Sequence, residues 1–255
     1  MQFYKILTCI LLALCTQSHG LFAQDASALL REAISLDKQL KEPEALDKYK
    51  QVLAADASNI NALLRCTELN AAIGARQKDK NAKLTYYTAA QTYAQQAIAA
   101  NPDNADANYA MAVAAGKLTE VEEDNKKLVE YVRQSKLYAD KALTINAGHA
   151  KANYTLGKWH FEMVNLNWVK KAAVKTLYGG LPKSEIDSAI FYMEKCRALD
   201  QYFVANMLDL AKVYQYNHQP TKAIEMLNKL IKLPNRTFDD AARKEEGKKM
   251  LDELK

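Results

Sequence analysis

Three stretches of this chain repeat one pattern, and this repetition restricts the fold more than any other feature of the sequence. The stretches are Ala45–Asn59 (ALDKYKQVLAADASN), Ala89–Asn104 and Ala189–Phe203. Each reads as a helix with small or apolar residues at matching offsets, followed by a turn that contains Asp or Asn. A second helix of the type found at Asn206–Pro220 lies before or after each one. The pattern predicts an array of helical hairpins, each packed mainly on its neighbours.

Five repeats can be aligned, and each has a small residue near the middle of both helices. The repeats begin near Ala26, Ile60, Ala105, Ala150 and Val204. The eighth position of the first helix holds Ala33, Thr67, Ala112, Gly157 and Ala211, and the close-contact position of the second helix holds Ala45, Ala90, Ser135, Ala189 and Ala223. Small residues at both positions allow two backbones to approach closely, which is the tetratricopeptide (TPR) pattern. We therefore predict an all-α TPR helical-hairpin solenoid of about five repeats.

The spacing between repeats predicts where this solenoid departs from a regular one. The repeat starts are separated by 34, 45, 45 and 54 residues, whereas the TPR unit has about 34 residues. Eleven extra residues equal about three helical turns, so we expect long helices over residues 78–100 and 125–146. Repeat four should contain an insert at about residues 164–182. A capping helix is expected at about residues 237–255, with Asp240 three residues after Thr237 in the manner of a capping box.

The first 23 residues have the features of a cleaved secretory signal peptide. Lys5 precedes the apolar stretch Ile6–Leu14, which is too short to span a bilayer, and Ala23 lies at the expected cleavage point. Residues 24–255 would then form the TPR-like domain of an exported protein, periplasmic or secreted. The alternative is an uncleaved segment that anchors the protein to a membrane through its N-terminus.

Composition and motif content argue against several classes of function. The formal net charge of +5 over 255 residues is far from a nucleic-acid-binding footprint. His149, His160 and His218 have no metal-ligand spacing, and no phosphate-binding loop, dinucleotide fingerprint or nucleophile elbow occurs. We expect no catalytic residues, no metal and no cofactor. Cys66 and Cys196 are predicted to be buried thiols rather than a disulfide.

The concave face of the solenoid is the surface on which we expect binding. The fifth position of each first helix, a typical contact position in TPR arrays, is apolar or aromatic. The predicted groove comprises Leu30, Leu64, Tyr109, Val113, Tyr154, Phe161 and Leu208, with Glu68, Lys158 and Lys212 at its edges. Such a groove would suit an apolar helix, an extended hydrophobic peptide or a lipid acyl chain. The alternative is that some of these residues pack between repeats.

The insert and its surroundings resemble the regulator of microtubule dynamics family. The resemblance rests on Gly157–Trp159, Val164–Trp168, Lys171–Ala173, Leu177–Gly179 and Pro182, and it extends from about Leu84 to Leu254. It implies an all-helical TPR domain without a catalytic centre. It also implies association with microtubules, mitochondria or lipid membranes. A microtubule role requires that residues 1–23 are not an export signal.

Two interpretations of the insert follow. In the structural one, which we favour, Trp159 and Trp168 are buried against repeat four. In the functional one, Lys170, Lys171 and Lys175 present a basic face to a membrane or a partner. A helix with three lysines is more often simply solvated.

Together these features predict a noncatalytic, exported TPR binding module that acts as a scaffold or adaptor. A carrier of a lipid or another apolar ligand in the concave groove is the first alternative. A microtubule- or organelle-associated regulator is the second. The sequence names no protein or peptide partner and leaves the oligomeric state open, and we expect no nucleic acid partner.

The export prediction can be checked directly. N-terminal sequencing of the mature protein should show a start at or near Gln24, because the apolar stretch and Ala23 direct cleavage there. Recovery of a chain that still begins with Met1 from a cytosolic fraction would contradict export and favour the microtubule-associated alternative.

Overall fold

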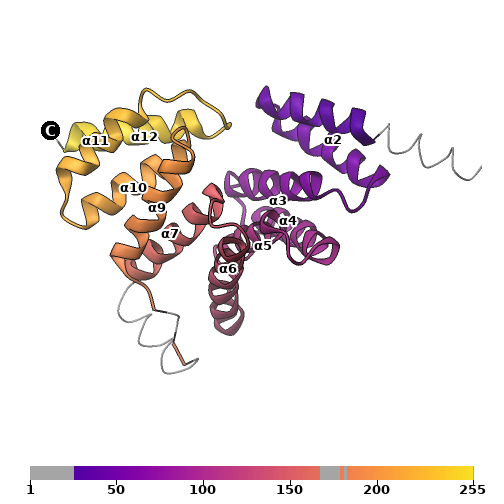
Figure 1. The fold of residues 1–255 in the computed structure, drawn as a ribbon, viewed down its shortest axis with the longest axis horizontal. Coiled ribbons are helices and arrows are strands. Elements are labelled where there is room, and N and C mark those ends of the chain that lie inside the picture. The colour runs from indigo at the N-terminus through magenta and orange to yellow at the C-terminus, as the bar shows by residue number, and fades with distance from the viewer. Residues whose placement is uncertain (1–25, 167–178, 181–182, 255) are drawn as a thin grey trace, which may run out of the picture.

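The computed structural model describes residues 26–166, 179–180 and 183–254, and within them only helices, turns and irregular segments occur. A helix over residues 26–38 comes first. It is followed by α2 (Glu42–Ala55), α3 (Ile60–Ala75), α4 (Lys80–Ala100), α5 (Ala105–Leu118), α6 (Asn125–Ile145), α7 (Ala150–Asn165), α9 (Ile186–Leu199), α10 (Val204–Tyr216), α11 (Pro220–Leu230) and α12 (Asp240–Glu253) (Figure 1). Helices α3 and α4, α5 and α6, α7 and α9, and α10 and α11 pack as hairpins. The predicted all-α helical repeat is confirmed.

The first helix of each repeat begins where the sequence predicts, and the residue before it often explains why. Asn59 and Asn104 cap α3 and α5, because each side chain accepts a hydrogen bond from a backbone N–H of the first turn. His149 does the same for α7 through Nδ1, which accepts from the N–H of Ala152 at 3.0 Å. Capping by polar side chains therefore fixes where α3, α5 and α7 begin.

The small residues lie at the helix crossings, as predicted. The alanines at both positions, such as Ala112 and Ala189, have no exposed surface. Where a hydroxyl replaces a methyl, it bonds across the crossing: Ser135 Oγ donates to the carbonyl of Ala112 at 3.0 Å. A Cβ on Gly157 would lie 2.7 Å from Met193 Cγ and 3.1 Å from the carbonyl oxygen of Ala189. Only glycine fits this crossing without a shift of the backbones.

The lengthened helices and the C-terminal helix are also confirmed. Helices α4 and α6 each contain 21 residues. Asp240 at the start of α12 accepts hydrogen bonds from the backbone N–H groups of Arg236 and Thr237, both at 2.8 Å. Met250 and Leu251 of α12 are buried in the same apolar cluster as Leu230. Helix α12 therefore covers the end of the last hairpin, as a solenoid cap does.

The structure answers only part of the question about the insert. Trp159 is 4% exposed, and its Nε1–H donates to the carbonyl of Val132 at 2.9 Å, so this tryptophan is buried as predicted. Trp168, Lys170, Lys171 and Lys175 lie outside the described residues. Both interpretations of the insert beyond α7 remain predictions.

The two ends of the array meet through side chains. The guanidinium of Arg76, which follows α3, donates to the carboxylate of Asp239 before α12 at 3.0 Å, across 163 residues of sequence. Arg76 also pairs with Glu42 and lies 4.6 Å from the ring centroid of Phe238. The early helices and α12 therefore face each other across the concave side (Figure 1). We refer to the contact of Arg76 with Glu42, Phe238 and Asp239 as the end contact.

The crossing at Gly157 gives a stability prediction. Gly157→Ala should lower the free energy of unfolding by about 1–3 kcal/mol, because the new methyl meets the backbone of α9 as well as Met193. Elsewhere in an exposed helix the same change is stabilising. Thermal or urea unfolding followed by circular dichroism would measure it.

Gly148→Ala is the matched control, since Gly148 is exposed in a turn. That variant should stay within about 0.5 kcal/mol of the parent. Equal stabilities for the two variants would show that the crossing does not need glycine.

Candidate binding cavity on the concave face

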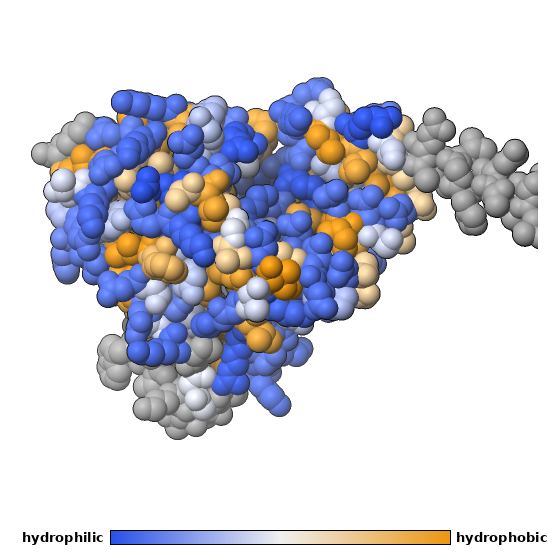
Figure 2. Space-filling model, in the orientation of Figure 1, coloured by the Kyte–Doolittle hydropathy of each residue, from blue (hydrophilic) through white to orange (hydrophobic). Residues whose placement is uncertain are grey.

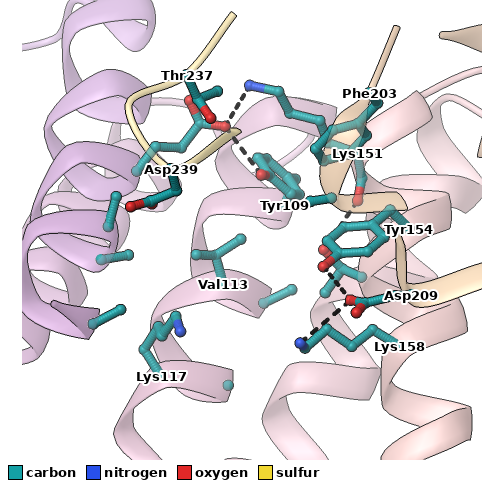
Figure 3. Close-up of a pocket in the computed structure, with 18 of the residues that line it drawn as sticks. Tyr109, Val113, Lys117, Lys151, Tyr154, Lys158, Phe203, Asp209, Thr237 and Asp239 are labelled. Carbon is teal, nitrogen blue, oxygen red and sulfur yellow. Dashed lines mark hydrogen bonds and ion pairs between the residues drawn. The ribbon is translucent and has the colours of Figure 1, made fainter. Parts of the chain in front are cut away.

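The concave side of the array contains a cavity of about 510 Å³. Its walls come from α3, α5, α7 and α10, and the segment before α12 contributes Arg236, Thr237 and Asp239. Figure 2 shows the recess between the C-terminal helices and the N-terminal ones, and the surface around it is mainly hydrophilic. In Figure 3 the labelled side chains of α5 and α7 point into this space from one side, with Thr237 and Asp239 on the segment opposite.

Most of the predicted groove residues come together in this cavity. They are Glu68, Tyr109, Val113, Tyr154, Lys158, Leu208 and Lys212. The four first helices lie side by side, so equivalent positions from different repeats reach the same space. Trp159 also borders the cavity from beneath.

Three predicted groove residues lie elsewhere, and the predicted groove needs this correction. Leu30 packs against the apolar cluster of the first hairpin, and Leu64 packs between α3 and the repeat that follows. Phe161 packs on the C-terminal cluster, with its ring centroid 5.6 Å from that of Tyr216. The superhelix is wound tightly enough that these side chains fill interfaces between helices instead of lining the open face.

Glu68 connects three repeats at one end of the cavity. Its carboxylate accepts from Lys151 Nζ at 2.6 Å and from the Tyr109 hydroxyl at 3.0 Å, and it also pairs with Arg65. These partners lie on α7, α5 and α3, in that order. Burial would raise the pKa of the carboxyl, but Lys151 and Arg65 outweigh burial and lower the pKa to about 2. Glu68 is therefore a largely covered anion held by two cations.

Asp209 is likewise an anion held by two cations, at the other end of the cavity. Its carboxylate accepts from the Tyr154 hydroxyl at 2.7 Å, and it lies 3.5 Å from Lys158 Nζ and 3.6 Å from Lys212 Nζ. Lys158 also lies 3.5 Å from Glu162, and Lys212 lies 2.8 Å from Glu246. Tyr109 and Tyr154, the two tyrosines at the fifth helix position, thus each donate their hydroxyl hydrogen to a carboxylate.

The cavity consequently contains more charged groups than the predicted groove, although most of its lining surface is apolar. Sequence reasoning placed three charged residues at the edge and missed the following lining residues: Asp37, Arg65, Lys151, Asp209, Asp239 and Arg243. One signal was present, because Arg65 and Asp209 both occupy the sixth position of a first helix, next to the fifth-position contact residues. The contribution from the segment before α12 had no local signal, since it depends on how far the array curls.

The described residues show no arrangement that indicates catalysis. Among them no group of three or more His, Cys, Asp or Glu side chains is placed to hold a metal. Cys66 and Cys196 are free and buried, as predicted, and burial raises the pKa of each thiol to about 12. A bilayer-spanning helix is likewise absent from the part of the chain that the structure describes.

The Glu68 carboxylate should make the free energy of unfolding depend on pH in the acid range. Its pKa in the fold is about 2, below its ordinary value of 4.5, so it contributes stability above pH 4.5 that is lost as the pH falls towards 2. The shift corresponds to about 3 kcal/mol. Glu68→Gln should therefore lower the free energy of unfolding at neutral pH and flatten its pH dependence between about 4.5 and 2, as measured by urea unfolding at a series of pH values.

Glu253→Gln, at an exposed position of α12, removes the same charge and serves as the control. It should leave both the stability and its pH profile close to those of the parent. An unchanged profile for Glu68→Gln would show that this carboxylate does not hold the repeats together.

Solved structures share this fold. A thermophilic TPR protein from Thermus thermophilus is similar with a TM-score of 0.64 and 16% identity, covering 87% of this chain and 98% of that one. PilW, a type IV pilus biogenesis factor, is similar with a TM-score of 0.54 and 16% identity, covering 90% and 93% of the two chains. At such identities the similarity shows the TPR fold alone.

Sequence comparisons identify the family. Regulator of microtubule dynamics protein 1 of Caenorhabditis elegans is 31% identical over 94 residues, which are 37% of this chain and 42% of that protein. Regulator of microtubule dynamics protein 2 of Mus musculus is 30% identical over 100 residues, which are 39% and 24% of the two chains. The matched segments thus span less than half of these relatives. The profile of the family described as Regulator of microtubule dynamics protein 1-3 matches residues 29–255, and the chain belongs to this family.

Proposed function

We propose that the protein is a noncatalytic interaction module that binds a segment of a partner protein in the concave cavity and acts as a scaffold or adaptor. The observation that favours this most is the cavity itself, which is enclosed by the first helices and the end contact and lined by hydrogen-bonding groups from four repeats. The TPR fold and the family membership support a binding role. The volume of the cavity would hold a few residues of an extended peptide.

The charged groups of the lining favour a peptide over an acyl chain, although the larger part of the lining surface is apolar. A hydrocarbon chain seated here would remove water from Glu68, Asp209 and their lysines without offering any hydrogen bond in return. Dehydrating charged groups in this way costs several kcal/mol per ion. A peptide supplies a backbone N–H and a C=O at every residue and can replace the displaced water. The lipid-carrier alternative therefore has less support.

The family offers a second candidate partner class. Its characterised relatives are named as regulators of microtubule dynamics, and a microtubule-associated protein is accordingly the runner-up partner. Export through cleavage of residues 1–23, which we retain as a proposal, would exclude that partner. The position of the mature N-terminus thus decides between the two.

A variant that fills the cavity can test the proposed function. Ala75 lines the cavity at the end of α3 and is exposed, so Ala75→Trp should fold normally while occupying ligand space. The purified full chain should select binding sequences from a random displayed-peptide library. Ala75→Trp should bind the selected peptides at least about tenfold more weakly, equivalent to about 1.4 kcal/mol of binding free energy.

Ala99→Trp is the matched control, because Ala99 is exposed on α4 and does not line the cavity. It should bind as the parent does. If neither variant weakens binding, the partner uses another surface. If the parent selects no peptide and releases a lipid on solvent extraction, as identified by mass spectrometry, the lipid-carrier alternative replaces the proposal.

A further inference from the structure

We propose that the partner segment is an acidic peptide, an extended chain rich in Glu or Asp, whose carboxylates bind Lys151, Lys158 and Lys212. The inference rests on the proposed function and specifies the chemistry of its ligand. It comes from how the charges of the cavity are arranged, since acids and bases contribute similar numbers to the lining.

Two carboxylates of the cavity are largely covered, and the lysines that pair with them are more exposed. The side chains of Glu68 and Asp209 are only 11% and 15% exposed. Those of Lys151, Lys158 and Lys212 are 42%, 44% and 34% exposed. Each of these two carboxylates therefore pairs with lysines whose side chains are more exposed than its own. A ligand that enters the cavity therefore meets these lysines, two of which also pair with the exposed acids Glu162 and Glu246.

These lysines have donors left for a ligand. An ammonium group has three N–H donors and no acceptor. Lys151 makes a short contact to Glu68, at 2.6 Å. Lys158 makes longer contacts, at 3.5 Å to both Asp209 and Glu162. A carboxylate arriving at about 2.7–2.9 Å would form stronger charge-assisted hydrogen bonds than those that Lys158 now makes.

Two exposed acids already occupy the positions that a ligand would take. Glu162 and Glu246 have side chains that are 55% and 56% exposed, and they pair with Lys158 and Lys212 at 3.5 Å and 2.8 Å. Exposed ion pairs contribute little to stability, so both acids can be displaced at small cost. In the free protein they act as the chain's own substitutes for ligand carboxylates.

The part of the cavity wall formed by the early helices and the segment before α12 does not repel an anion. Asp37 is held by Arg65, with Nε at 2.8 Å, and Asp239 is paired with Arg76 and Arg243. Glu42 pairs with Arg76 as well. Each of these three carboxylates is thus covered by a guanidinium. Val113 supplies an apolar contact between the two ends (Figure 3).

Fluorescence anisotropy with labelled homopeptides tests the proposal on the purified full chain. Hexaglutamate should bind at least about tenfold more tightly than hexaglutamine, and hexalysine should not compete. The affinity for hexaglutamate should fall steeply between about 50 mM and 200 mM salt, because the lysines are partly exposed.

Charge variants then locate the site. The double variant Lys158→Gln with Lys212→Gln should bind hexaglutamate at least about tenfold more weakly. Lys232→Gln with Lys248→Gln makes the same change in net charge at exposed positions outside the cavity, and it should bind as the parent does. Glu162→Gln and Glu246→Gln should each strengthen binding by a few-fold, because each frees a lysine from a competing carboxylate.

The gain in affinity expected for Glu162→Gln and Glu246→Gln tests the proposal even if the lysine variants are unstable. Unchanged affinity in both glutamine-for-glutamate variants, or equal losses in the cavity and control lysine variants, would overturn it. Hexaglutamine binding as tightly as hexaglutamate, with Ala75→Trp blocking both, would overturn the acidic preference and leave the cavity function intact. Lysine-dependent binding to phosphatidylcholine vesicles containing phosphatidic acid, without binding of hexaglutamate, would overturn it in favour of an anionic lipid.

Discussion

Backbone contact between the two helices of each hairpin is the constraint on which the rest of this structure depends. The crossing residues, from Ala33 to Ala223, are small and buried, and at Gly157 no additional carbon fits. Close crossings make each hairpin a compact unit, and the small rotation from one unit to the next sets the curvature of the array. Because the curvature is tight, side chains from four first helices reach one shared space instead of lining an open trough.

Because side chains from several repeats meet in this space, the charged side chains there also hold the repeats together. Glu68 is held by groups on three helices, and Lys151 reaches it across 83 residues of sequence. Such contacts bind non-adjacent repeats to each other, whereas repeats in most solenoids touch only their neighbours. The residues that shape the cavity and those that would touch a ligand are therefore largely the same set. A substitution in the cavity should be tested for stability before a loss of binding is interpreted.

The sequence predicted local features well and the cavity incompletely, for a physical reason. Repeat starts, small crossing residues, long helices and the C-terminal cap follow from periodicity and capping, which act within a few residues. The polarity of the cavity depends on pairs such as Lys151 with Glu68, for which no short-range pattern exists. Leu64 and Phe161 occupy positions that face outward in a wide superhelix but lie in interfaces in this tight one. The curvature of the array, which no single repeat encodes, determines which of these side chains line the cavity and which lie in interfaces.

The end contact at Arg76 also bears on how quickly a ligand can come and go. Arg76 and Asp239 are 28% and 22% exposed, so water and salt partly screen the ion pair between them. Separating the two ends would break the contacts of Arg76 with Asp239 and Phe238 without unfolding any hairpin. A bound segment would exchange through this opening by a small elastic change in curvature. The array would therefore be stiff along the row of hairpins and would open most easily where its two ends meet.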